Sequence, residues 1–248
     1  MPGTSAVRHV TTGWLAAVQA IGKDLVEVMR LIALADVHGY HEVYDWLVDL
    51  VDAEDSDAVV LAGDLLGWGG DSDTVEEAQA ADRLQVLHRL SEIKRPIFYV
   101  MGNDDWIELD APHPSHQSVH GKRINLGNFN FVGYQHTLPF MGGVHEKSEH
   151  EIERDLALLE AEIDSTTVLV THGPAYGILD KVHSGQHVGS KSLREFIERT
   201  APRVHIHGHI HREFGRAGCH FNVSSAGRKR AMVIDLLTME HRVIEGAG

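Results

Sequence analysis

Five short motifs in this chain place a metal-capable side chain beside or near a glycine, and each motif follows a short apolar run. The motifs are Asp36-Val37-His38, Gly63-Asp64, Gly102-Asn103-Asp104-Asp105, Thr171-His172-Gly173 and Gly208-His209-Ile210-His211. Ligands of open α/β sheets bind at the carboxyl ends of strands, where glycine allows sharp turns. We therefore expect seven side chains to meet at one edge: Asp36, His38, Asp64, Asn103, His172, His209 and His211.

This set of carboxylate, amide and imidazole groups suits two divalent ions, with one carboxylate able to bridge them. The chain has a single cysteine, Cys219, so a thiolate site is excluded. The mixture of ligands favours Mn, Fe, Zn, Ni or Co over Ca or Mg. Two such ions roughly 3.5–4 Å apart clamp a phosphoryl group and generate hydroxide for in-line attack. Each motif alone is typical of a turn or a helix cap, and it is the ordered set of five that points to catalysis.

The apolar patterns predict the elements that carry these motifs. Strands are expected at 31–35, 58–62, 97–101, 128–134, 166–170, 204–207, 221–224, 232–236 and 241–244, and helices at 41–53, 74–93, 148–163 and 192–199. The alternation of strands and helices indicates an α/β fold, and this many strands favours two packed sheets with helices outside. Residues 1–28 are interpreted as an N-terminal helical extension, amphipathic from Trp14 onward, and residues 29–248 as a single domain.

Taken in this order, the five motifs resemble the signature of the calcineurin-like metallophosphoesterases, and the resemblance covers residues 31–245. The part from His172 to His211 is most similar to the subgroup of metallophosphoesterase-domain-containing proteins. The resemblance implies a two-sheet β-sandwich flanked by helices, over a metallophosphoesterase domain at 29–248. It also implies two metal sites. One would be held by Asp36, His38, Asp64 and His211, and the other by Asp64, Asn103, His172 and His209, with Asp64 bridging.

One position departs from the family, which usually has Gly-Asn-His-Asp or Gly-Asn-His-Glu where this chain has Gly102-Asn103-Asp104-Asp105. The family's histidine contacts the scissile phosphate and helps the leaving group depart. An ionised carboxylate at Asp104 cannot donate a proton and repels phosphate, so three alternatives stay open. Asp104 is held protonated by burial, or it binds metal, or it marks weak catalysis. His136, just after the strand at 128–134, is our candidate for a substitute acid, beside the plain interpretation of a loop histidine.

The expected function is that of a hydrolase, a binuclear metal-dependent phosphoesterase that cleaves a phosphodiester or phosphomonoester through metal-activated hydroxide. The alternative is a metal-binding scaffold of the same fold, to which Asp104 points. The intact set of seven ligands favours the enzyme. In the long loop 176–191, Lys181, His183 and His187 are candidates for substrate contacts, whereas the basic run at 228–230 indicates a solvated turn.

The charge balance restricts the partners. There are 22 Lys and Arg residues against 36 Asp and Glu residues, so the formal net charge is -14. Such a chain repels long nucleic acid, which argues against a nuclease and for a small phosphorylated substrate, with nucleotide-like molecules included. No apolar stretch is long enough for a membrane span, and no signal peptide is evident, so we expect a cytoplasmic protein; a homodimer is left open.

Overall fold

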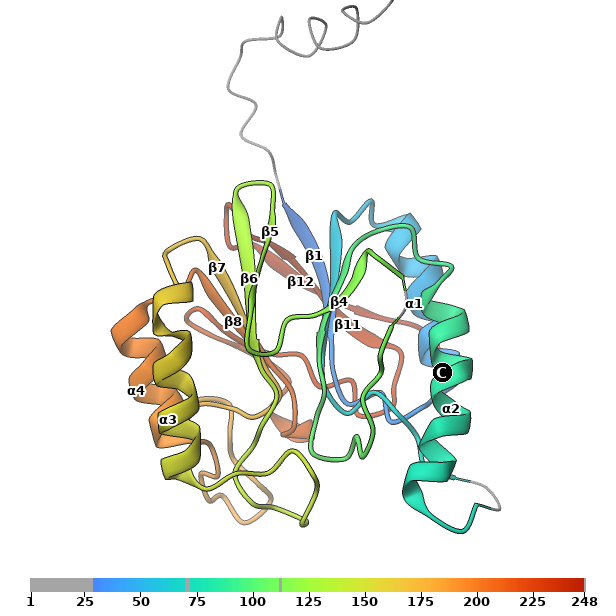
Figure 1. The fold of residues 1–248 in the computed structure, drawn as a ribbon. Helices are drawn as coiled ribbons and strands as arrows, with labels where there is room; N and C mark the ends of the chain where they lie inside the picture. The colour runs from blue at the N-terminus through green and yellow to red at the C-terminus, as the bar shows by residue number, and fades with distance from the viewer. Residues whose placement is uncertain (1–28, 70–71, 112, 248) are drawn as a thin grey trace, which may run out of the picture.

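The computed structural model describes residues 29–69, 72–111 and 113–247, which form two six-stranded sheets stacked between two pairs of helices (Figure 1). The order of the first sheet is β12-β11-β1-β2-β3-β4. Its strands are β1 (Arg30–Leu34), β2 (Ala58–Ala62), β3 (Ile97–Val100), β4 (His116–Ser118), β11 (Arg230–Asp235) and β12 (His241–Glu245). The order of the second sheet is β5-β6-β7-β8-β10-β9. Its strands are β5 (Arg123–Leu126), β6 (Phe129–Tyr134), β7 (Thr167–Thr171), β8 (Val204–His207), β9 (Gly215–Ala217) and β10 (His220–Asn222).

The helices cover the outer faces of the two sheets. The first sheet carries α1 (His41–Ala53) and α2 (Val75–Leu90), and the second carries α3 (Glu149–Leu159) and α4 (Lys191–Thr200) (Figure 1). Local signals fix where these helices begin. The side chain of Thr74 accepts a hydrogen bond from the Glu77 amide at the start of α2. Ser148 and Glu151 form a reciprocal capping box at the start of α3.

Strand β2 shows why the central strands are continuous apolar runs. All five of its residues are buried, because one face packs against the other sheet and the opposite face packs against the helices. Val60 belongs to the core between the sheets, whereas Val59 and Leu61 belong to the core under α1 and α2. Between the sheets, the rings of Phe98 and Phe131 stack with centroids 4.0 Å apart.

The chain direction brings the functional motifs to one end of the sandwich. Strands β1, β2 and β3 pair in parallel in the first sheet, and β6, β7 and β8 pair in parallel in the second. At the carboxyl end of β1 the two sheets are also joined by backbone hydrogen bonds, from Ala35 N–H to Val223 O and from Ser225 N–H to Ala35 O. The loops that leave both sheets at this end therefore face one another.

The expected α/β class with two sheets is confirmed, and all nine predicted strands and four predicted helices are present. Three further strands, β4, β5 and β9, were not predicted. The helix expected within residues 1–28 lies outside the described residues. Across the described ranges, no helix is long and apolar enough to cross a membrane.

Candidate metal centre

Seven side chains converge on the end of the sandwich where the parallel strands of both sheets terminate. The first sheet supplies Asp36 and His38 after β1, Asp64 after β2 and Asn103 after β3. The second sheet supplies the remaining three, His172 after β7 and then His209 and His211 after β8. The predicted ligands therefore come from loops of both sheets, and these loops are far apart in the sequence.

One group of possible ligands consists of Asp36, His38 and His211, and their ligand atoms all lie within 4.8 Å of one another. The Nε2 atoms of His38 and His211 are 3.4 Å apart, and His211 Nε2 lies 3.4 Å from Asp36 Oδ1. Asp36 is fully buried, whereas the side chain of His211 is 48% exposed. This group is thus open to solvent on the His211 side.

A second group consists of Asp64, His172 and His209, again with ligand atoms within 4.8 Å of one another. His172 Nε2 lies 3.2 Å from Asp64 Oδ2 and 3.1 Å from Asn103 Oδ1. Asp64 Oδ2 is also 3.9 Å from His38 Nε2 in the first group. Asp64 therefore lies between the two groups, in the position that a bridging carboxylate requires.

The chemistry of these side chains fits divalent transition metals. The two groups together offer two carboxylates and four imidazoles, with the Asn103 amide oxygen beside them. His172 Nδ1 lies 2.8 Å from the carbonyl oxygen of Ala62, to which it can donate, while Nε2 faces Asp64 and Asn103. A backbone carbonyl on the outer nitrogen is the usual partner of a metal-binding histidine.

The charges within the centre shift the titration of its histidines. Burial lowers the pKa of His172, but Asp64 and Asp36 outweigh it and raise that pKa to about 10. Burial likewise lowers the pKa of His38, while Asp104, Asp64 and Asp36 raise it to about 9. Burial raises the pKa of Asp64, yet the neighbouring His172 and His38 hold it below its ordinary value. In the metal-free protein these histidines thus carry the positive charge that the buried carboxylates require.

Four ligand residues adopt a left-handed backbone conformation. The φ angles are +55° at Asp36, +49° at His38, +51° at Asp64 and +67° at His209. Such angles cost free energy for residues other than glycine and tend to cluster at functional sites. Hydrogen bonds among the ligand loops hold them, from Asp36 N–H to Gly63 O, from His38 N–H to Asp64 O and from His209 N–H to the Asp36 carboxylate.

Asp105 fastens two of these loops together, a role that the sequence analysis missed. Its buried carboxylate accepts hydrogen bonds from the backbone N–H groups of Leu65, Leu66 and Gly102, each at 2.8 Å. Burial and the nearby charge of Asp64 raise the pKa of Asp105 to about 7, although these backbone donors oppose the shift. Asp105 thereby fixes the loop after β2 against the loop after β3.

Asp104 is oriented toward His38, one of the predicted ligands. Its Oδ2 atom lies 3.2 Å from His38 Nδ1 and accepts a hydrogen bond of 3.2 Å from the indole N–H of Trp68. Its backbone N–H donates to Asp64 Oδ1 at 2.8 Å. The side chain of Asp104 is 23% exposed and borders the cavity above the centre.

That cavity has a volume of about 590 Å³ and opens above the metal ligands. Beyond the ligands and Asp104 its lining includes Phe140, Met141, Val182, His183, Arg212 and Arg228. His183, a predicted substrate contact, is thus at the cavity, whereas Lys181 and His187 are absent from its lining. His187 instead contacts Asp180. Arg228 lies in the predicted exposed turn, and neither it nor Arg212 had been predicted as a site residue.

His136 lies beside this cavity and is not part of its lining. It lines an adjoining pocket of about 90 Å³, which shares His209 and Phe140 with the larger cavity. Burial, with Lys147 and His120 nearby, lowers the pKa of His136 to about 3, so the ring is neutral at pH 7. The role of His136 as an acid stays a prediction.

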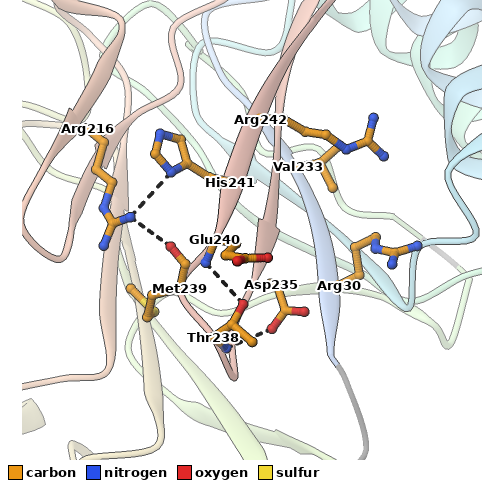
Figure 2. Close-up of a pocket in the computed structure, with 9 residues that line it drawn as sticks. All are labelled: Arg30, Arg216, Val233, Asp235, Thr238, Met239, Glu240, His241 and Arg242. Atoms are coloured by element: carbon orange, nitrogen blue, oxygen red, sulfur yellow. Dashed lines mark hydrogen bonds between the residues drawn. The ribbon is translucent and has the colours of Figure 1, made fainter.

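A further cavity of about 620 Å³ lies around the amino-terminal end of β1, opposite the end that carries Asp36 (Figure 2). Its arginines are engaged within the protein. Arg216 donates to Met239 O and contacts His241 Nδ1, Arg242 pairs with Glu54, and Arg30 donates to Glu54 O (the first two contacts are drawn in Figure 2). None of the seven predicted ligands lines this cavity.

Comparisons with known proteins give the family and the fold of the chain. The sequence profile of a family described as calcineurin-like phosphoesterase matches residues 29–213. Among solved structures, protein TT1561 of Thermus thermophilus is similar with a TM-score of 0.69 and 17% identity, over 88% of this chain and 99% of that one. A dimetal phosphatase from Danio rerio is similar with a TM-score of 0.60 and 13% identity, again over 88% and 99% of the two chains. At these identities the likeness shows a common fold.

A probable rhamnogalacturonate lyase C of Emericella nidulans is 28% identical over 231 residues, which is 86% of this chain and 19% of that protein. The chain spans about a fifth of the length of the curated relatives that it matches.

Proposed function

We propose, because this chain belongs to the calcineurin-like phosphoesterase family, that it is a binuclear metal-dependent hydrolase of small phosphodiesters or phosphomonoesters. The observation that carries the proposal is the pair of ligand groups that meet at Asp64 beneath an open cavity. A scaffold without catalysis has no evident use for this arrangement, in which all seven predicted ligands face one centre.

Each group would hold one divalent ion, and manganese is our first candidate among Mn, Fe, Zn, Ni and Co. Asp36, His38 and His211 would hold one ion, His172, His209 and Asn103 the other, and Asp64 would contact both. When bound, the two ions would polarise the phosphoryl oxygens and lower the pKa of an attacking water. The chain's own part is to hold the ions at a fixed spacing, because the ligand loops are hydrogen-bonded to one another.

Cationic side chains at the cavity would orient the phosphate. Arg212 and Arg228 border the cavity, and His183 adds an imidazole. Arg212 is oriented by a hydrogen bond of 3.2 Å from its Nη1 to Val182 O. Guanidinium groups bind phosphate oxygens through paired hydrogen bonds, so these residues would offset the net negative charge of the protein at its site.

Two exposed aromatic rings lie beside His38 and His211, where an aromatic part of a substrate would stack. Tyr40 and Trp68 are 51% and 54% exposed and line a shallow cavity together with His38 and His211. Exposed aromatic rings stack on nucleobases without requiring a particular base. This pair favours a nucleotide-like phosphoester among the small substrates.

Metal analysis and an ester screen on the purified chain test the proposal. Metal-free protein titrated with Mn²⁺ is expected to bind two ions, and Asp64→Asn is expected to weaken both, because Asp64 lies between the two groups. Asp110→Asn is the matched control, since Asp110 is an exposed carboxylate that pairs with Arg83. The loaded protein is then assayed on p-nitrophenyl phosphate, bis-p-nitrophenyl phosphate and cyclic nucleotides. Absence of turnover on all of them with two ions bound would refute the enzyme.

A further inference from the structure

We infer that Asp104 is a positioning residue for His38, one of the proposed metal ligands. The inference rests on the metal sites of the proposed function and adds a role that the ligand set does not include. It follows from which nitrogen of His38 meets the metal centre and which meets Asp104.

The two ring nitrogens of His38 face different partners. Nε2 faces the centre, 3.4 Å from His211 Nε2 and 3.9 Å from Asp64 Oδ2. Nδ1 faces away from it, 3.2 Å from Asp104 Oδ2. A carboxylate oxygen accepts hydrogen bonds, so Asp104 keeps the hydrogen on Nδ1, and Nε2 becomes available to an ion once that nitrogen has lost its proton.

Asp104 is itself held in place by neighbours that do not depend on a substrate. The indole N–H of Trp68 donates to the same Oδ2 atom that faces His38. The backbone of Asp104 is fixed on both sides, because its N–H donates to Asp64 Oδ1 and its carbonyl accepts 2.6 Å from Gln79 Nε2.

This arrangement separates the side chain of Asp104 from its backbone in an experiment. The hydrogen bond from its N–H to Asp64 persists in any variant at position 104 other than proline, so side-chain variants change mainly the contacts to His38 and Trp68. Asp104→Ala removes the acceptor from His38. Asp104→Asn keeps an acceptor, because its amide oxygen can receive the Nδ1–H of His38 while its charge is lost.

Zinc titration of the metal-free full chain by calorimetry measures the effect. In Asp104→Ala we expect one of the two ions to bind about 10- to 100-fold more weakly, as is typical when the outer partner of a metal-binding histidine is lost. The other ion should change by less than about threefold, and Asp104→Asn should recover most of the loss. The control is Asp110→Asn, which changes an exposed carboxylate that pairs with Arg83, so both affinities should stay at the wild-type value.

The tautomer of His38 gives a readout that does not depend on affinity. In nitrogen-15 spectra of the zinc-loaded protein, His38 should show a hydrogen-bonded Nδ1–H, present in wild type and Asp104→Asn and lost to fast exchange in Asp104→Ala. His38→Gln assigns the signal. Should Asp104→Ala be too unstable to load, the spectra of wild type and Asp104→Asn still test the tautomer.

Two results would overturn the inference: equal zinc affinities in wild type and Asp104→Ala, or a wild-type His38 that binds zinc through Nδ1. A protein that shows the expected zinc pattern but cleaves no phosphoester would leave the inference standing and refute the proposed enzyme instead.

Discussion

The Asp64 carboxylate occupies the space next to Gly102 that a side chain would otherwise take. A Cβ atom built on Gly102 would lie 2.1 Å from Asp64 Oδ1 and 2.4 Å from the Asp64 backbone nitrogen. Glycine is therefore needed at position 102 for a spatial reason, the close approach of the loop after β3 to the central ligand. The position of Asp64 between His38 and His172 therefore depends on a residue that contributes no predicted ligand atom.

Gly102→Ala is accordingly expected to damage both metal sites at once. The added methyl group has to displace Asp64 or the backbone beside it, at a cost of about 1–3 kcal/mol in the free energy of unfolding. Both Mn²⁺ ions should bind more weakly, as measured by calorimetry alongside urea unfolding. Gly69→Ala is the matched control, since a Cβ at Gly69 meets nothing within 4 Å. Wild-type affinity for both ions in Gly102→Ala would show that the loop yields freely.

Metal binding is expected to release protons at pH 7. The pKa of His172 is raised to about 10 and that of His38 to about 9 in the metal-free protein, in each case because nearby carboxylates outweigh burial. Both rings must lose a proton to bind an ion. Calorimetric heats in PIPES and in Tris should therefore differ by the ionisation heats of the released protons, and affinity should rise between pH 6 and pH 8. Identical heats in both buffers would show that the rings are already neutral.

The same raised pKa values set the sign of a stability effect in metal-free protein. A group whose pKa is higher in the folded state stabilises that state below its unfolded value, near 6.5 for histidine. The contribution of His38 and His172 is therefore present at pH 6 and is lost as the pH rises through about 9 to 10.

Arg228→Met should weaken substrate binding more than it slows turnover. If Arg228 contacts the phosphate equally in the bound and transition states, KM rises by about tenfold while kcat changes little. Steady-state kinetics on an aryl phosphate ester measures both parameters. Lys229→Met removes the same charge from the next residue. Lys229 shares a second pocket with Arg228, Glu42 and Glu245 but is absent from the lining of the cavity above the candidate centre, so its KM should stay near wild type. An equal effect of the two variants would show that Arg228 acts on substrate binding through its charge at a distance and not through direct contact.

Acid should destabilise the fold through a buried group of histidines in the second sheet. His205 Nε2 lies 2.8 Å from Thr171 Oγ1, and its Nδ1 lies 3.0 Å from His220 Nδ1. Burial, followed by His207 and His220, lowers the pKa of His205 well below its ordinary value. Below pH 6.5 the unfolded chain binds a proton at His205 more readily than the folded chain does. The free energy of unfolding is therefore highest above pH 6.5 and falls as the pH drops below that value.

Urea unfolding of metal-free protein at pH 7 and pH 5 measures this loss, which we expect to be on the order of 1–2 kcal/mol for one such histidine. His205→Phe should be less stable than wild type at pH 7 yet lose less on acidification. His150→Gln, at an exposed position, should lose as much as wild type. A wild-type loss in His205→Phe would place the acid sensitivity elsewhere.

The strands that position the ligands could be predicted because they are buried on both faces. Strand β2 lies in the middle of its sheet, and its unbroken apolar run can be recognised in the sequence. Strands β4, β5 and β9 are three or four residues long, and each lies at the edge of a sheet. An edge strand pairs on one side only and needs no apolar run, so composition does not distinguish it from a loop.

The candidate site was predictable to the extent that its residues come directly after such strands. Asp64 and His172 could be predicted for that reason, because each belongs to a motif that follows a buried strand. Arg212 and Arg228 come from a short 3₁₀ turn and an exposed turn, and only the packing of the two sheets brings them to one cavity. Asp104 and His38 are 66 residues apart in the sequence and belong to different motifs. Sequence spacing does not predict which ring nitrogen of a histidine faces which neighbour, because tertiary packing sets the orientation of the ring.

The left-handed backbone at four ligands also limits how this centre can change by mutation. Aspartate, asparagine and histidine are the side chains that tolerate this conformation best after glycine, and β-branched residues tolerate it worst. The residue types that bind metal are thus nearly the same as those that the backbone accepts at Asp36, His38, Asp64 and His209. In a saturation library at these four positions, few amino-acid types would be compatible with folding, and many of those few could bind a metal ion. Exchange of one metal-binding side chain for another is therefore an easier evolutionary path here than loss of the centre to an apolar replacement.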